Sequence, residues 1–395
     1  MLNEARTAEV VELCRRFIRQ PSLSGHEGAM AGLVREAMEA MGYDEVRVDS
    51  YGNVVGRIRL KKPGRKILFE AHMDHVDVTD RSRWSVDPYG AEIRDGKIYG
   101  RAASDMKGSL ASMIAAASYL KQDHYEDLAG EVLVAGSVHE ECFEGVACRE
   151  ISEIYRPDFV VIGEASSLNV KRGQRGRAEI LLEVVGKSAH SSNPQEGINA
   201  VKKMMAVLRT IEAGYVAPEH AVLGKGILEL TDIISHPYPG ASVVPERCRV
   251  TFDRRLLVGE TEDSVLKAIR DLIEEAVRED PKIKASVSIA IGRDRCYTGK
   301  GIEAKRFAPG WLLDENHELV EKALMGLKSV GLSPELSHYA FCTNGSYYAG
   351  IAGIPTIGFG PSREELAHVV DEYVEISQLR GATEGYYAIA KEVLK

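Results

Sequence analysis

The stretch FEAHMDHVDV, residues 69–78, changes within a few positions from a strand-like apolar sequence to a cluster of imidazoles and carboxylates. Similar apolar runs recur along the chain at 46–60, 131–138 and 158–162. Apolar residues at helical spacing alternate with these runs, at 4–19, 27–41 and 107–121. Strands that alternate with helices predict an α/β domain with a largely parallel central sheet, covered by helices on both faces.

The pattern changes between residues 176 and 292. Strand-like and helix-like segments follow one another there in the order β-α-β-β-α-β, which is the ferredoxin-like arrangement. After residue 293 the α/β pattern resumes, with a helix at 315–330 and a buried strand at 354–360. We therefore expect a catalytic α/β domain formed by residues 1–175 and 293–395, interrupted by an inserted α+β domain at 176–292.

The charge, the apolar segments and the cysteines of the chain indicate which partners it lacks and where it is located. Its 395 residues carry a formal net charge of −9, whereas nucleic-acid binding needs clustered lysines and arginines, so we expect no nucleic-acid partner. No stretch approaches the length of an apolar membrane span, so we expect no membrane partner. The six cysteines are scattered and the N-terminus lacks a signal-peptide pattern, which indicates reduced thiols in a cytoplasmic protein.

The first polar cluster contains His72 and Asp74, two positions apart on one face if the strand continues. A histidine that binds a metal usually has its second ring nitrogen held by a carboxylate or a carbonyl, and Asp74 is placed to do this. A hydrogen-bonded histidine without a metal fits the same two residues. The remaining strand ends decide between these interpretations.

Carboxylates stand at three further places, one in a loop before a predicted helix and two at the ends of apolar strands. Asp105 stands just before a predicted helix, where it could also act as an N-cap. Glu140 and Glu141 end one apolar strand, and Glu164 ends another. Carboxylates at the ends of buried strands are costly unless a cation neutralises them, so this pattern favours a metal site.

His368 follows another apolar strand near the end of the chain. A lone histidine in that position is often structural, but here it would complete a set of two histidines, one aspartate and two glutamates. Nitrogen and oxygen ligands of this kind suit zinc, with cobalt or manganese as substitutes. Five ligands exceed one tetrahedral site, so the sequence predicts two divalent metal ions bridged by one carboxylate.

Five ordered motifs resemble those of the M20 family of metallopeptidases and deacylases: HMD, GRAASDMKGSLASM, HEE, GEAS and AHVVDEYV. The family includes carboxypeptidase G2, acetylornithine deacetylase and succinyl-diaminopimelate desuccinylase, and the resemblance covers nearly the whole chain. More narrowly, RGQRGR, CTNGS and IGFGPSREELAH resemble the YgeY-type subgroup of selenium-metabolism-linked hydrolases.

The resemblance implies a role for each candidate residue of the metal site. Asp105 would bridge the two ions, with His72 and Glu164 on one ion and Glu141 and His368 on the other. Glu140 would be the general base that takes a proton from the attacking water. The substrate would be a small amino-acid-derived molecule, such as a dipeptide or an N-acyl amino acid.

The resemblance also implies roles outside the metal ligands. The inserted domain would serve as a lid and as the interface of a homodimer, in which His190 stabilises the oxyanion in the partner's active site. Asn199 would anchor substrate, and Arg255 would grip a substrate carboxylate, with Arg254 as the adjacent alternative. Asn344 stands where many relatives have an acidic residue, and we expect it among the substrate-binding residues.

Two other functions fit parts of this pattern. A two-metal phosphoesterase uses similar ligands, but it needs cationic groups to hold phosphate, and the strand-end motifs offer few. A non-catalytic binding or assembly protein on the same fold would be free to lose Glu140 or Glu141, and both are present. The sequence therefore favours a metal-dependent hydrolase of peptide or N-acyl amide bonds.

Overall fold

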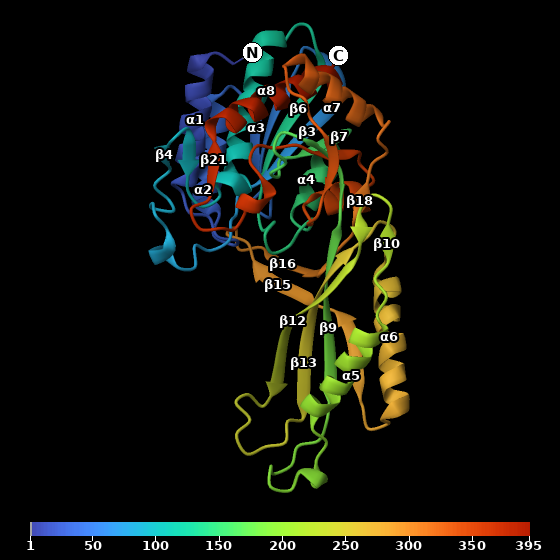
Figure 1. Cartoon of the computed structure of the whole chain (residues 1–395). Helices are drawn as coiled ribbons and strands as arrows, with labels where there is room; N and C mark the ends of the chain where they lie inside the picture. Colours follow the sequence, from blue (N-terminus) through green and yellow to red (C-terminus); the bar gives the residue numbers. More distant parts are fainter. Residues whose placement is uncertain (1) are drawn as a thin grey trace. The chain divides into compact units, whose positions relative to one another are not determined.

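The computed structural model describes residues 2–395, which form two compact units (Figure 1). Among the described residues, the first unit comprises 2–174, 293–303 and 311–395, and the second comprises 175–292 and 304–310. The segment 304–310 differs from the predicted division, which gave it to the first domain. It joins the second unit because β17 (Phe307–Ala308) pairs with β9 (Gly176–Val185).

The first unit is built on a nine-stranded mixed sheet. Its four central strands are parallel, in the order β6 (Ala129–Ser137), β3 (Lys62–His72), β7 (Phe159–Ile162) and β20 (Thr356–Gly358). The flanking strands are β1 (Glu45–Val48), β2 (Val54–Arg59), β8 (Val170–Gln174), β18 (Trp311–Leu312) and β19 (Leu336–Tyr339). Among these flanking strands, β8 and β19 pair in parallel, and the other pairings are antiparallel. The predicted α/β class with a largely parallel central sheet is confirmed.

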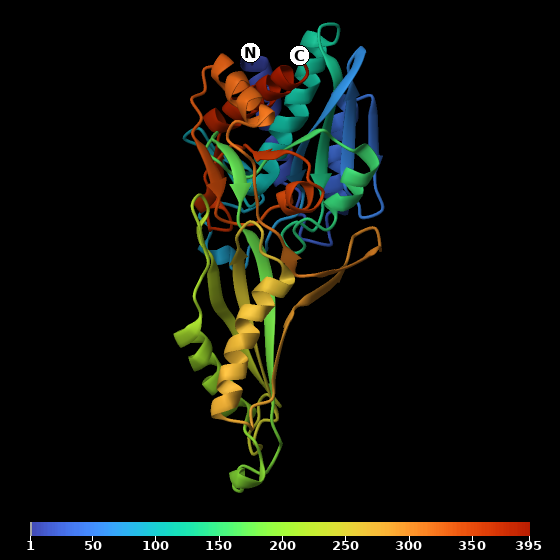
Figure 2. The same ribbon diagram turned by 90° about the vertical axis from the view of Figure 1, so that its right-hand side faces the viewer.

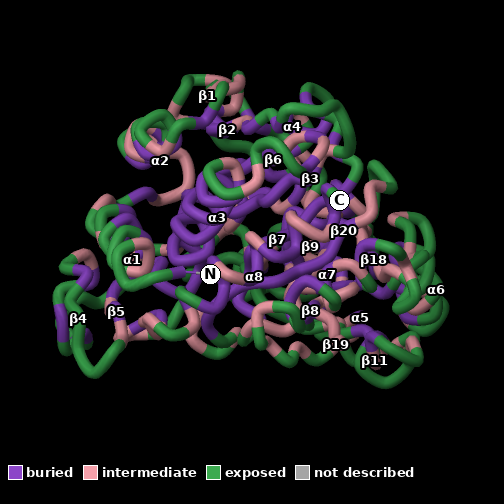
Figure 3. The backbone as a smooth tube through the Cα atoms, turned by 90° about the horizontal axis from the view of Figure 1, so that it is seen from above, coloured by how far each residue is buried: buried purple, intermediate pink, exposed green. Residues whose placement is uncertain are grey.

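Helices cover both faces of this sheet. They are α1 (Glu4–Ile18), α2 (Gly28–Ala40), α3 (Gly108–His124), α4 (Cys148–Tyr155), α7 (Glu318–Ser329) and α8 (Ile376–Val393). Leu68 packs in one apolar cluster with residues of α4, whereas its neighbour Phe69 contacts Tyr386 of α8 on the opposite face. Helix α3 is buried along most of its length, as the purple tube in Figure 3 shows. No described helix has the length and apolar character that crossing a membrane requires.

The second unit contains a five-stranded antiparallel sheet with two helices on one face. Its elements follow in the order β9, α5 (Ala200–Gly214), β12 (Ile227–His236), β13 (Arg247–Leu256), α6 (Glu262–Glu279) and β14 (Ala285–Ile289). The strand order is β12-β13-β9-β14, with β17 added beside β9. Alternate residues of β9 and β13 pack with α5 and α6 in one apolar core, and Figure 2 shows α6 in yellow-orange along this sheet. The short hairpin β10 (Glu219–His220) and β11 (Gly224–Lys225) lies between α5 and β12 in the sequence.

Two small sheets complete the fold. One contains β4 (Glu92–Arg94), β5 (Lys97–Tyr99) and β21 (Tyr373–Glu375), and the other is the hairpin β15 (Ile291–Arg295) and β16 (Gly301–Lys305). The tip of the hairpin belongs to the first unit, where the Tyr297 hydroxyl donates a hydrogen bond to the Gly52 carbonyl at 2.9 Å. A Cβ on Gly52 would lie 2.3 Å from Cε1 of Tyr297, so the ring occupies space that only glycine leaves open.

Candidate metal centre

The carboxyl ends of the central strands carry most of the predicted ligands. His72 is the last residue of β3, Glu140 and Glu141 lie in the turn after β6, and Glu164 lies two residues beyond β7. Parallel strands place such residues at one edge of the sheet. Asp105 belongs to the irregular segment η2 (Ala103–Lys107) before α3, and His368 follows the short segment η5 (Glu364–Leu366). All six residues belong to the first unit.

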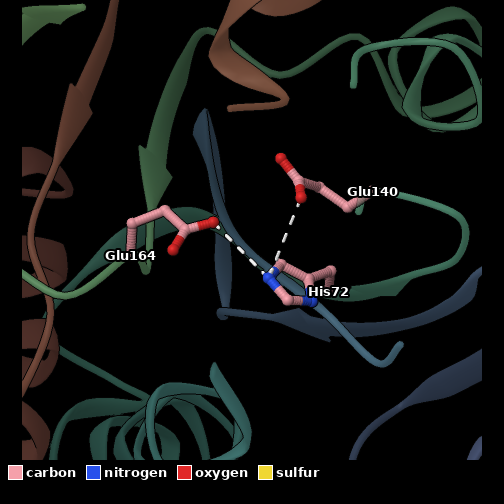
Figure 4. A group of neighbouring side chains, drawn as sticks. All are labelled: His72, Glu140 and Glu164. Carbon is pink, nitrogen blue, oxygen red and sulfur yellow. Dashed lines mark ion pairs between the residues drawn. The ribbon is translucent and has the colours of Figure 1, made fainter. Parts of the chain in front are cut away.

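The imidazole of His72 is the point at which three carboxylates converge. Its Nε2 atom lies 2.9 Å from Oδ1 of Asp105 and 3.5 Å from Oε1 of Glu164. Oε2 of Glu140 lies 3.9 Å from the same nitrogen, and Figure 4 shows Glu140 and Glu164 pointing at it from two sides. His72 is therefore in reach of side chains from three different segments of the chain.

Asp105 lies between the two histidines. Its Oδ2 atom is 3.0 Å from Nε2 of His368, while Oδ1 faces His72. His368 is also 3.1 Å from Oε2 of Glu141. The five predicted ligands thus form one continuous cluster in which each oxygen of Asp105 faces a different imidazole.

Two groups of side chains in this cluster have the spacing to hold an ion. Within each group, one ligand atom per residue lies within 4.8 Å of the others. One group is His72, Glu140 and Glu164, and the other is His72, Asp105 and Glu141. This grouping differs from the predicted ligand pairs, since Glu140, predicted as a base, stands among possible ligands, and His368 belongs to neither group.

The electrostatics of the cluster favour a bound cation. Burial raises the pKa of Glu141 and of Glu164 to about 7, and the neighbouring charge of Asp105 adds to the effect. Burial raises the pKa of Glu140 well above its usual range. A divalent cation would offset the cost of ionising these carboxylates.

The pKa values of the two histidines are raised as well, which favours their charged forms. Hydrogen bonds to Asp105 and Glu141 raise the pKa of His368 to about 10. Burial alone would raise the pKa of Asp105, but its hydrogen bonds with His368 and His72 lower it. In addition, Oε1 of Glu140 is buried without a hydrogen-bond partner. A mixed set of imidazoles and carboxylates, one with an unpartnered oxygen, fits divalent metal ions such as zinc.

Asp74 contacts His72 through its backbone carbonyl, which is one of the two kinds of partner expected for the second ring nitrogen. The Nδ1 atom of His72 lies 2.9 Å from the backbone carbonyl of Asp74, where it can donate, and 3.7 Å from the carboxylate. The carboxylate instead accepts hydrogen bonds from the Ser24 hydroxyl at 2.7 Å and from the backbone N–H groups of Glu140 and Glu141 at 3.1 and 3.2 Å. Asp74 therefore holds the turn that carries both glutamates.

Asn344 has no free group with which to bind substrate in this structure. Its side chain is buried, and its amide nitrogen donates to Glu70 at 2.8 Å and to Ser137 at 3.1 Å. Its amide oxygen accepts from the Gly145 N–H at 2.7 Å. The expectation that Asn344 contacts substrate is therefore wrong for this conformation, because its polar groups already have partners.

Two of the predicted residues of the second unit, His190 and Asn199, lie at or before the start of α5. Asn199 is the N-cap of α5, where its side-chain oxygen accepts from the Lys202 N–H, and its role as a substrate anchor stays a prediction. His190 lies exposed in the turn before α5, with Nδ1 2.7 Å from the Ser192 hydroxyl.

The two adjacent arginines of β13 face opposite sides of the sheet. Arg254 is buried, and its Nη2 atom donates to Oε1 and Oε2 of Glu260 at 2.6 and 2.9 Å. Arg255 is partly exposed on the face away from the helices and pairs with Asp253 at 2.8 Å. Arg255 thus remains the candidate for a substrate carboxylate.

Two residues around the site were not singled out from the sequence. Ser24 gave no signal, since its bond to Asp74 joins segments 50 residues apart. Glu372 lies in the AHVVDEYV motif, four residues after His368, and the structure buries it completely. Its signal in the sequence was its position, because it is an acidic residue in the same motif as the predicted ligand His368.

Comparisons with known proteins identify the family. The family described as Peptidase family M20/M25/M40 matches residues 68–392. The chain is 35% identical to the uncharacterized protein YgeY of Escherichia coli (strain K12) over 97% of this chain and 94% of that protein. It is 26% identical to succinyl-diaminopimelate desuccinylase 2 of Ruegeria sp. (strain TM1040), with the same shares covered.

Among solved structures, the Bacillus subtilis YXEP protein, a dinuclear metal binding peptidase of the M20 family, has the same fold. The TM-score is 0.74 at 14% identity, and the match covers 99% of each chain. The family expected from the five motifs is confirmed. Because the family match spans most of the chain and YgeY is similar over nearly all of it, the chain belongs to peptidase family M20/M25/M40, whose members are metal-dependent hydrolases of peptide and amide bonds.

Proposed function

We propose that this chain is a dinuclear metal-dependent amidohydrolase that cleaves a peptide or N-acyl amide bond in a small amino-acid-derived substrate. The observation that carries this proposal is the position of Asp105, whose two oxygens face the two different imidazoles of His72 and His368 at 2.9 and 3.0 Å. A carboxylate in this position can be shared by two ions. The dinuclear metal binding of the similar YXEP protein supports the proposal.

In this proposal, Asp105 is shared, His72 and Glu164 complete one set of ligands, and Glu141 and His368 complete the other. Zinc is the proposed metal because imidazole nitrogens and carboxylate oxygens suit it, and cobalt or manganese would serve as substitutes. When bound, the ions would polarise the substrate carbonyl and lower the pKa of water.

Glu140 is the proposed general base. Its carboxylate is buried, one oxygen lacks a hydrogen-bond partner, and its pKa is raised by burial. A base with a raised pKa can both accept a proton from the attacking water and give it to the leaving amine. The Asp74 carboxylate holds the backbone N–H of Glu140, so Asp74 orients the base rather than reacting itself.

The second unit supplies the proposed substrate groups. Arg255 would bind a substrate carboxylate through its planar guanidinium group, and His190 would stabilise the oxyanion. We also infer a homodimer through the second unit, supported by the exposed edge strand β12, and a cytoplasmic location, supported by six cysteines that form no disulfide bond. The desuccinylase name of the Ruegeria relative favours N-acyl amino acids among the substrates to be tested.

The test is amine release from a panel of dipeptides and N-acyl amino acids, with zinc-, cobalt- and manganese-loaded protein. We expect the wild type to cleave one class, and Glu140→Gln to lose about 10²–10⁴-fold in turnover while it retains its metal content, because only the proton acceptor is removed. Metal content is measured by mass spectrometry of the dialysed protein. Glu153→Gln, which neutralises an exposed glutamate of α4, is the matched control and should turn over normally.

Near-normal turnover in Glu140→Gln would refute the assignment of the base. If no panel member releases amine but a phosphate ester is hydrolysed, the protein is a two-metal phosphoesterase. If no substrate of either class reacts, the binding or assembly function gains support.

A further inference from the structure

The carboxylate of Glu372 is buried and makes three polar contacts with one loop. Its Oε1 atom accepts hydrogen bonds from the backbone N–H groups of Ser104 at 2.8 Å and Asp105 at 3.1 Å. Its Oε2 atom pairs with Nη1 of Arg101 at 2.6 Å. Both oxygens of this side chain are therefore bonded to the segment 101–105.

Arg101 is itself held firmly. Its backbone N–H donates to the Pro88 carbonyl at 2.8 Å, and its guanidinium group lies 5.2 Å from the ring centroid of Trp84. The backbone around Glu372 is also fixed, because the Gly100 N–H donates to the Glu372 carbonyl at 2.8 Å and β21 pairs with β5. The carboxylate thus joins two well-anchored pieces of backbone.

These two pieces carry two of the candidate ligands. Asp105 is in the first, and His368 lies four residues before Glu372 in the second. Neither ligand sits in regular structure, since Asp105 has φ −125° and ψ 89° inside η2, and His368 has φ 63°. Irregular backbone has no ladder of its own hydrogen bonds, so its position depends on bonds from outside.

We propose that Glu372, paired with Arg101, is a positioning residue of the metal centre. It fixes the loop of Asp105 against the segment of His368, so that the contact of 3.0 Å between these two side chains is set before an ion binds. This inference rests on the proposed function, because it concerns the same ligands. A carboxylate suits the task since one oxygen serves two N–H donors while the other serves Arg101.

The test is the affinity of chelator-stripped protein for zinc ion, measured by competition with a coloured chelator. We expect Glu372→Gln to bind zinc about 10–100-fold more weakly than the wild type, because residues that hold metal ligands have effects of this size. Glu372→Asp keeps the charge but shortens the side chain, and it should also bind zinc more weakly. It provides the measurement if Glu372→Gln does not fold.

Two further variants make the result decisive. Glu131→Gln breaks the ion pair with Arg57 between β2 and β6, in the same unit, and should leave zinc affinity unchanged even if it lowers thermal stability. Asp105→Asn removes a proposed ligand and should weaken zinc binding at least as much as Glu372→Gln. Wild-type zinc affinity in folded Glu372→Gln and Glu372→Asp, with weakened binding in Asp105→Asn, would overturn this inference and leave the proposed function standing. Wild-type affinity in Asp105→Asn would instead overturn the proposed function.

Discussion

Glu27 shows how one buried side chain contributes to the pH dependence of stability. It lies at the start of α2, where one oxygen accepts a hydrogen bond from the His139 N–H at 3.1 Å and the other is buried without a partner. Burial raises the pKa of Glu27 to about 7, and the charge of Asp74 adds to the effect. The unfolded chain has a glutamate pKa of about 4.3.

Glu27 should therefore reduce stability as the pH rises. Below about pH 4.3 both states keep the proton, and between about pH 4.3 and 7 the unfolded state loses it first, so the free energy of unfolding falls. Across this pH range the ionisation of Glu27 lowers the free energy of unfolding by about 3–4 kcal/mol. We expect Glu27→Gln to gain about this much relative to the wild type between pH 4 and pH 8, as measured by urea unfolding with a chelator present. Parallel pH profiles for the two proteins would contradict the prediction.

Single residues also show what the sequence can and cannot predict. The cluster of carboxylates and histidines at the strand ends was predictable. Burying carboxylates costs free energy unless a cation neutralises them, and parallel strands bring their ends to one edge of the sheet. The partners of Asp74 and Asn344 were not, because hydrogen bonds to Ser24, Glu70 and Gly145 depend on segments far apart in the chain. A residue type indicates which bonds it can make, whereas the packed fold decides which it does make.

At the scale of elements, the long helices were predicted closely. The expected ranges 27–41, 107–121 and 315–330 correspond to α2, α3 and α7, since apolar spacing persists over several turns in each. The run at 46–60 proved to be two strands, β1 and β2, separated by the turn that contains Gly52. The strands β15 to β18 were not predicted, because they have only two to five residues and none of them contains an apolar run of four residues like that of β7.

The tip of the β15–β16 hairpin should depend on Gly52. We expect Gly52→Ala to displace the Tyr297 ring, because the new Cβ would lie 2.3 Å from Cε1, and trypsin should then cut faster at Arg295 and Lys300. Gly96→Ala is the control, since Gly96 also has a positive φ, of 73°, but has no atom within 4 Å of an added Cβ. The rate of cleavage is read by mass spectrometry of the fragments. Equal cleavage rates in both variants would show that Tyr297 does not hold the tip.

At the scale of the whole molecule, the outer strand of the second unit is exposed. Strand β12 forms one end of its sheet, and Ile233 and Ile234 on it are 51% and 50% exposed. Ile227 and Leu230 on the same strand are exposed as well. An apolar edge strand of ten residues invites pairing with another chain, which is the basis of the proposed homodimer.

We expect the wild type to sediment with twice the chain mass of 43.4 kDa, and Ile234→Lys to sediment as a monomer. A lysine on an edge strand opposes pairing because its charge would be buried in the interface. Met325→Lys on α7 replaces a residue of similar exposure in the first unit and should remain dimeric. A monomeric wild type, or a dimeric Ile234→Lys variant, would refute the proposed interface.

The path of the chain between the two units limits which fragments can be expressed as a single unit. The chain passes from one unit to the other after residues 174, 292, 303 and 310, so deletion of 175–292 alone would leave β17 without β9, its partner strand. A gene fragment for the second unit has to run from 175 to 310 without a break. That fragment would carry the hairpin tip without Gly28 and Gly52, and the ring of Tyr297 would be left in water.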